Sequence, residues 1–356
     1  MVAAAWLVGG CGPKPPPPKP PEPAPVAEPE APAEPEAPPA PPPKVPEDAF
    51  SIGSFNVDWA FDNLADKRPK SAQEHTSPDQ EAWEWKRDRI VEVLVAEKLD
   101  IVVLSELGGE RELGDIVLGV GSKDGPDYQY AWVKGEDSFS GKQTAILSRF
   151  PISNERRTDA YAPIHVAAEV ELPTGDVITV IGMQLKEGTN KAAVSKRLEM
   201  AKSLKRRAVA EQKKHPVIIV GTLGDPTLPF DEGYDESAAG MLAGKSTKKE
   251  SDDCQDSAEE RLAQDVGVLS RDPLDRIFVC GLDMRGAETS GRELIVRGEE
   301  DPDDTPWPSV ALEEGPKRDV SDQLVVWAEV ALPKKPEPEP AEGEGGEAAA
   351  DEGEGG

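Results

Sequence analysis

The stretch Leu99-Asp100-Ile101-Val102-Val103-Leu104-Ser105-Glu106 decides the fold of this chain. Its apolar residues, Ile101 to Leu104, lie between polar ones, as expected for a strand that is covered on both faces. Strands of this kind form the sheets of layered α/β proteins, and polar groups at their carboxyl ends are the usual place for chemistry. The stretch therefore predicts a buried strand with a candidate functional residue, Glu106, at its end.

Further elements of an α/β domain lie on both sides of this strand. Residues 51–57 alternate as in a strand, and Ser77-Pro78-Asp79-Gln80 predicts a helix that begins with Ser77 as its N-cap and ends near Lys98. The segment 229–265 is rich in Gly, Ser and acids and is predicted to be a surface insertion. More strands are predicted at 128–134, 144–148, 166–172, 177–183, 217–221, 276–280 and 324–330, and a long helix at 190–215.

Composition limits the folded part to residues 49–332. Residues 12–48 are mostly Pro, Ala and Glu and predict a disordered, extended spacer, and residues 333–356 predict a disordered acidic tail. The net charge of the chain is −29, of which the spacer contributes −4 and the tail −6, leaving −19 on the domain. Because nucleic acids are bound largely through Lys and Arg, this charge argues against tight non-specific nucleic-acid binding.

Residues 1–11 are apolar and small, and they end in Leu7-Val8-Gly9-Gly10-Cys11 directly before the spacer. This resembles a bacterial lipoprotein signal, although no Lys or Arg precedes the short apolar run. The resemblance implies a lipid anchor on Cys11 and a place in the cell envelope, at the outer membrane or in the periplasm. A chance apolar start on a cytoplasmic protein is the alternative. In the envelope, Cys254 and Cys280 could pair as a disulfide, and two separate thiols remain the other reading.

Polar residues stand at the ends of most of the predicted buried strands. Such positions are fixed by the strand and open toward solvent at the sheet edge. They are Asn56, Glu106, Gln184, Thr222, Asp275 and the run Ser321-Asp322-Gln323.

In this order, the strand ends resemble the endonuclease/exonuclease/phosphatase superfamily from Phe50 to about Val330. The motifs that carry the resemblance are Ser-Phe-Asn56, the run ending at Glu106, the strand 144–149 and Leu274-Asp275-Arg276-Ile277. The resemblance implies an α/β fold, a four-layer α/β sandwich of the DNase I-like type, with two mixed sheets flanked by helices. It also implies hydrolysis of phosphoester bonds with Mg²⁺ or a similar cation.

The departures from the family fall on the residues that handle protons and phosphate. Members of the family carry His at the position of Gln184, Gly-Asp-x-Asn at 221–224 and Ser-Asp-His at 321–323, where this chain has Gly-Thr-Leu-Gly and Ser-Asp-Gln. General acid–base assistance is worth roughly 10²- to 10⁴-fold, so these losses predict little turnover. Asn56, Glu106 and Asp322 could still hold Mg²⁺ or Mn²⁺ through oxygen ligands, and Gln184 and Gln323 could donate to an oxyanion.

Two residues could replace the missing catalytic groups. A two-residue turn at Thr174-Gly175 would place His165 opposite Gln184 on the same face of a hairpin. A loop of different shape could return Asp225 to the position of the lost Asp. The other histidines offer less, since His75 is expected to be exposed and His215 lies at the wrong end of its strand.

Three hypotheses follow for the function. The first is a pseudoenzyme of the envelope that has weak or no hydrolytic activity and keeps a role in binding a metal or phosphate-containing ligand, or in scaffolding. The second is an active metal-dependent phosphodiesterase or nuclease that uses His165 or Asp225. The third is a structural surface protein. The candidate site residues are Asn56, Glu106, Asp275, Asp322, His165, Gln184 and Gln323.

Overall fold

The structure, a computed structural model, describes residues 46–64, 68–134, 140–158, 165–247, 249–259, 274–291, 294, 320–321 and 323–333. The predicted signal with Cys11, nearly all of the spacer, the tail after Pro333 and Asp322 lie outside the described residues. No helix within the described ranges is both long and apolar enough to cross a membrane.

The first sheet is built from β1 (Ala49–Ala60), β2 (Ile101–Leu107), β3 (Gln129–Ala131), β4 (Gln143–Ser148), β11 (Met284–Ser290) and β12 (Val325–Ala331). Its six strands lie in the order β11-β12-β1-β2-β4-β3. β1 and β2 are parallel and are joined by α1 (Gln80–Glu97), whereas the other neighbours are antiparallel.

The second sheet repeats this plan with β5 (Ile152–Arg157), β6 (Val166–Glu171), β7 (Val177–Gln184), β8 (Val217–Thr222), β9 (Gln255–Asp256) and β10 (Asp275–Cys280). Its six strands lie in the order β5-β6-β7-β8-β10-β9. β7 and β8 are the parallel pair, joined by α3 (Lys191–Glu211), and the other pairs are antiparallel.

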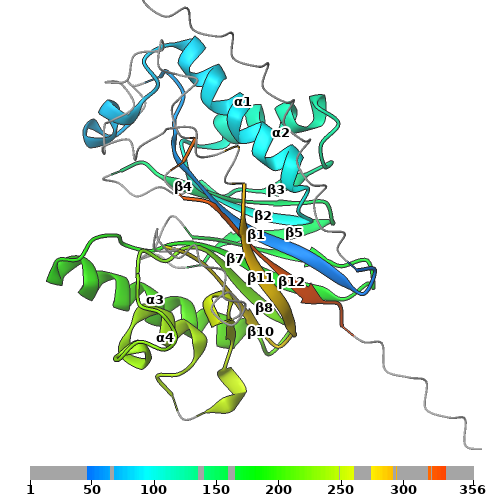
Figure 1. Ribbon diagram of the computed structural model, residues 1–356, viewed down its shortest axis with the longest axis vertical. Coiled ribbons are helices and arrows are strands. Elements are labelled where there is room, and N and C mark those ends of the chain that lie inside the picture. Colours follow the sequence, from blue (N-terminus) through cyan, green and yellow to red (C-terminus); the bar gives the residue numbers. More distant parts are fainter. Residues whose placement is uncertain are drawn as a thin grey trace, which may run out of the picture. The chain divides into compact units, whose positions relative to one another are not determined.

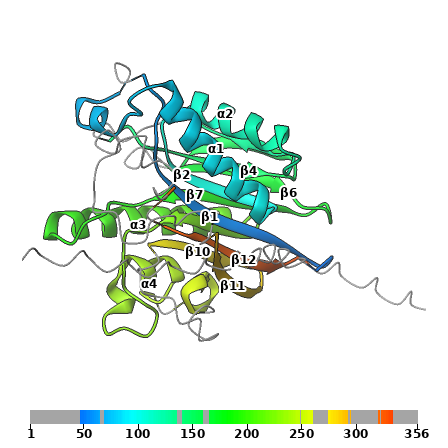
Figure 2. The ribbon, with the colours of Figure 1, turned by 45° about the horizontal axis from the view of Figure 1, so that its top comes forward.

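The two sheets face each other across one apolar core, which includes Ile101 and Val103 of the first sheet and Ile218 and Val220 of the second. Helices α1 and α2 (Glu110–Ser122) cover the outer face of the first sheet through a second core. Helices α3 and α4 (Ala238–Ala243) cover the outer face of the second sheet through a third. Figures 1 and 2 show these layers, and the predicted four-layer α/β sandwich with two mixed sheets is confirmed.

Local details differ from the sequence-based predictions. Helix α1 begins at Gln80, and its N-cap is Asp79, whose side chain accepts from the Ala82 N–H; the Ser77 hydroxyl instead donates to the Phe61 carbonyl. Helix α2 and strands β5 and β11 were not predicted, and three glycines weaken the helical signal of α2.

The segment predicted as a surface insertion, 229–265, has exposed residues at 245–247 and 249 within its described part, but it also contains buried elements. Every residue of α4 is buried, since this short helix packs in the core beneath the second sheet. The side chain of Asp256 is fully buried as well and pairs with Arg276.

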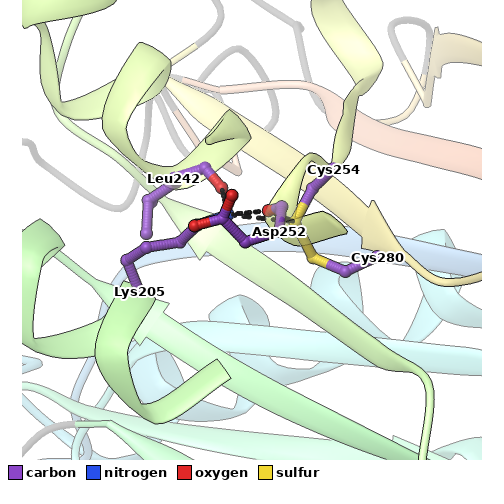
Figure 3. Close-up of a disulfide and its surroundings, with 5 residues drawn as sticks. All are labelled: Lys205, Leu242, Asp252, Cys254 and Cys280. Atoms are coloured by element: carbon purple, nitrogen blue, oxygen red, sulfur yellow. Dashed lines mark hydrogen bonds between the residues drawn. A yellow bond between two sulfur atoms is a disulfide. The ribbon is translucent and has the colours of Figure 1, made fainter. Parts of the chain in front are cut away.

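Cys254 and Cys280 form a disulfide, which settles the alternative that the sequence left open. It ties the loop after α4 to the end of β10 (Figure 3). Beside it lies the ammonium of Lys205, which donates to the carbonyls of Leu242 and Asp252 and contacts the Cys254 sulfur at 3.5 Å. Burial lowers the pKa of Lys205.

Candidate functional site

The candidate site lies where the carboxyl ends of the two parallel strand pairs meet. Asn56 pairs with Ser105 where the regular ladder of β1 and β2 is interrupted, and Gln184 pairs with Thr222 at the end of β7 and β8. The Asn56 amide joins the two sheets by donating to the Thr222 hydroxyl at 3.3 Å. The fold therefore brings together residues that are far apart in the sequence.

Glu106 is the centre of this site. It follows the last regular residue pair of β2 and has a φ of 69°, in the left-handed region, at the point where the ladder with β4 is interrupted. Its Oε1 accepts from Asn56 Nδ2 at 3.1 Å and from Gln184 Nε2 at 2.9 Å. The ammonium of Lys142 lies 2.6 Å from the same oxygen, and Oε2 accepts from the Trp59 backbone N–H at 3.3 Å. Four donors thus surround one buried carboxylate.

Burial and charge act in opposite directions on the central ion pair. Burial raises the pKa of Glu106 to about 7, Lys142 opposes that rise, and the charges of Glu187 and Asp58 add to it. Burial alone would lower the pKa of Lys142. The carboxylates of Glu106, Glu187 and Asp58 outweigh burial and raise the pKa of Lys142 above its ordinary value. Lys142 therefore carries its charge at neutral pH.

Beside Glu106 lies a buried network of hydrogen bonds centred on the Thr222 hydroxyl. The Thr222 hydroxyl donates to Asp275 Oδ1 at 2.7 Å, accepts from Asn56, and lies 2.9 Å from the Ser105 hydroxyl. The other Asp275 oxygen accepts from Ser54 at 2.6 Å. Burial raises the pKa of Asp275 to about 6, against the lowering effect of these hydrogen bonds.

A divalent cation does not fit this arrangement of side chains. Mg²⁺ requires oxygen ligands, but Asn56 Oδ1 accepts from the Asp58 N–H at 2.9 Å, so Asn56 presents its amide nitrogen to the site. Gln184 also presents its nitrogen to Glu106. No group of three or more His, Cys, Asp or Glu residues suited to a metal occurs in the described part of the chain.

His165 does not stand opposite Gln184, and the predicted register is wrong. The pairs Glu171–Val177 and Val166–Gly182 show that the hairpin turn is one residue longer than predicted, which shifts every pairing by one. The His165 ring is 1% exposed, and its Nε2 lies 3.1 Å from the backbone carbonyl of Gln184. This contact joins His165 to the main chain of the site.

The Asp225 carboxylate is used elsewhere. One oxygen accepts from the backbone N–H and hydroxyl of Thr227, and the other accepts from the Ala238 N–H where α4 begins. Arg197 lies 3.9 Å away as an ionic partner. Asp225 therefore stabilises the loop between β8 and α4.

Ser321 and Gln323 lie beside Asn56 of β1. The Ser321 hydroxyl donates to the Asn56 carbonyl at 2.7 Å and accepts from the Gln323 backbone N–H at 3.0 Å. Gln323 thus joins the site through Ser321, and Asp322 lies outside the described residues.

Sequence comparison and structural comparison give different results for this chain. No protein-family model and no curated protein matches the sequence. Zebrafish (D. rerio) TDP2 in complex with a single-strand DNA product matches the structure with a TM-score of 0.50 at 16% identity, and a humanized form of the same protein does so at 14% identity. A functionally unknown protein from Enterococcus faecalis also has a TM-score of 0.50, at 13% identity. Each match covers 80% of this chain and 100% of the other.

The chain has the DNase I-like fold. This is the fold that the resemblance to the endonuclease/exonuclease/phosphatase superfamily implies. At such low identity the likeness shows the fold alone, so the chemistry has to be argued from the residues of this chain.

Sequence reasoning missed two residues of this site in the DNase I-like fold, Lys142 and Trp59. Lys142 directly precedes β4, whose pairing of Gln143 with Leu107 places Lys142 beside Glu106. The antiparallel neighbour of β2 was the signal that could have found it. Trp59 follows Asn56 closely, and its indole lies 4.0 Å from the Lys142 ammonium on one side and stacks on His75 at 3.7 Å. His75 is half-buried, so the prediction that it is exposed is wrong.

Proposed function

We propose that this DNase I-like domain does not hydrolyse phosphoesters and acts as a scaffolding domain. The observation that carries the proposal is the position of Thr222. In the family that the sequence resembles, an Asp at this position organises the attacking water. A threonine hydroxyl has no suitable pKa for that task, and this one already donates its proton to Asp275.

The neighbouring carboxylate of Asp275 does not replace the lost base. Asp275 is 1% exposed and both of its oxygens accept hydrogen bonds, from Ser54 and Thr222. The two candidates for replacement, His165 and Asp225, are engaged with the main chain and with the β8–α4 loop. The active-enzyme alternative therefore gains no support from them.

Burial and charge favour scaffolding over the binding of a phosphate-containing ligand in this centre. Asn56, Glu106, Gln184 and Thr222 are each at most 3% exposed. Glu106, Glu187 and Asp58 together outnumber Lys142, so a phosphate would meet a negative surrounding.

We also propose that the domain is held at the cell envelope by lipid on Cys11, with residues 12–48 as the spacer. The composition of residues 1–11 supports the lipid anchor. The disulfide between Cys254 and Cys280 supports the envelope, because disulfides persist in oxidising compartments. Membrane fractionation of cells that express the chain or its Cys11→Ala variant tests the anchor. Release of the variant is expected, and equal distribution of both proteins would refute it.

Hydrolysis assays test the main proposal. The purified chain and its Glu106→Gln variant are compared with Mg²⁺ and with Mn²⁺ on single- and double-strand DNA and on phosphomonoesters and phosphodiesters. We expect both proteins to give the same background rate. Turnover that disappears in Glu106→Gln would overturn the proposal and restore the active-enzyme alternative.

A further inference from the structure

The place of Lys142 in the fold gives it a role that no catalytic motif requires. It directly precedes β4, and the register of β4 with β2 brings its side chain to Glu106. The ammonium is 2.6 Å from Glu106 Oε1, and Lys142 is only 8% exposed although it ends in a charged group. Long charged side chains are rarely buried to this degree without a specific partner.

The surroundings of the ammonium are those of a bound cation. Glu106, Glu187 and Asp58 all act on it electrostatically. The face of the Trp59 indole lies 4.0 Å from Nζ, in the geometry of a cation–π contact. These groups come from the end of β1, the end of β2 and the segment after β7. One positive charge thus faces carboxylates from separate elements.

The amides at the site complete this pattern. Asn56 and Gln184 both direct NH₂ groups at Glu106, and the Asp58 N–H fixes the orientation of the Asn56 amide. Donors suit a carboxylate whose counter-charge is an ammonium, whereas a divalent cation requires the oxygen ends of such amides.

We infer that the ammonium of Lys142 is the resident cation of this site and takes the place of a divalent metal ion. The chain therefore does not bind Mg²⁺ or Mn²⁺ at Glu106. Removal of the Lys142 charge leaves Glu106, Asp58 and Glu187 without this counter-ion, so such a variant tests whether the ammonium is what keeps a divalent cation from Glu106. This inference deepens the proposed function. It rests on the proposed function because both treat the centre as an altered hydrolase site.

Binding of Mn²⁺ in the absence of substrate tests this inference. The full chain is compared with Glu106→Gln, Lys142→Met, Lys142→Arg and the double variant Lys142→Met/Glu106→Gln, and free Mn²⁺ is measured by electron paramagnetic resonance. Methionine keeps the apolar stem of Lys142 without its charge, and arginine keeps the charge as the matched control. Circular dichroism and thermal melting report whether each variant is folded.

We expect no Glu106-dependent Mn²⁺ binding by the wild-type chain or by Lys142→Arg. Lys142→Met should bind Mn²⁺ at least about tenfold more tightly than the background binding of the wild-type chain and melt at a higher temperature when Mn²⁺ is added, and the double variant should lose both effects. Binding by the wild-type chain that Glu106→Gln abolishes would overturn the inference, as would a folded Lys142→Met that gains none. If Lys142→Met does not fold, Lys142→Gln replaces it. The comparison of the wild-type chain with Glu106→Gln still decides whether Mn²⁺ binds at Glu106.

The two proposals fail in different ways. Wild-type Mn²⁺ binding without turnover would overturn the inference and leave the proposed function in place. Glu106-dependent turnover without metal binding would overturn the proposed function and leave the inference about Lys142 in place.

Discussion

The hydroxyl of Thr222 donates a hydrogen bond to Asp275 across 2.7 Å, between paired residues of β8 and β10. Asp275 is fully buried at this point, and burial raises its pKa to about 6 although the hydrogen bonds to it favour the ionised form. The folded protein therefore holds a proton on Asp275 more tightly than the unfolded chain does, for which the pKa of Asp is about 3.9.

This difference predicts a pH dependence of stability. Because the folded state binds the proton more tightly, Asp275 makes the protein less stable as pH rises from about 4 to about 6. Asp275→Asn removes the titration. In urea unfolding between pH 4 and pH 7, the free energy of unfolding of the wild type minus that of the variant should fall by about 2 to 3 kcal/mol. A difference that is constant, or that grows with pH, would contradict the raised pKa.

Trp59 is expected to stabilise the site through its ring. Its indole contacts the Lys142 ammonium and stacks on His75. Trp59→Leu should lower the free energy of unfolding by about 1 to 2 kcal/mol more than Trp59→Phe, which keeps an aromatic face. Chemical denaturation of both variants measures this, and equal losses would show that the ring contacts contribute little.

Asp256 and Arg276 form an ion pair at 3.0 Å in which both side chains are 0% exposed. Asp256→Ala takes away the carboxylate partner of a buried guanidinium, so a loss of about 3 to 5 kcal/mol is expected. Asp48→Ala is the matched control, because Asp48 pairs with Arg285 at the surface and exposed pairs often contribute nothing measurable. Similar losses in the two variants would contradict this account of Arg276.

The sequence predicted the strands that are buried on both faces, and these strands indicated the fold. A short apolar run between polar residues, such as Ile101–Leu104, is typical of such a strand. It also predicted the strand ends at Asn56, Glu106, Gln184 and Thr222, which the structure brings together. It could not predict the place of His165, because a single extra residue in a turn reverses which face a side chain occupies. Lys142 was missed because its role depends on a neighbour in the sheet rather than on its neighbours in the chain.

The disulfide between Cys254 and Cys280 closes a loop with a sequence separation of 26 residues. Replacing both cysteines by alanine should lower the free energy of unfolding by about 3 kcal/mol, because the unfolded chain regains the freedom of that loop. Dithiothreitol should produce a loss of similar size in the wild type and none in the double variant. A wild type that is equally stable in both redox states would show that the bridge contributes little.

A crystal structure of the chain grown with Mn²⁺ tests most directly whether Glu106 is partnered by Lys142 rather than by a metal ion. Anomalous scattering locates Mn²⁺ independently of the refined side chains. We expect the Lys142 ammonium within hydrogen-bonding distance of Glu106 and no anomalous peak beside that carboxylate. A Mn²⁺ ion bound to Glu106, with the side chain of Lys142 displaced, would contradict the central claim.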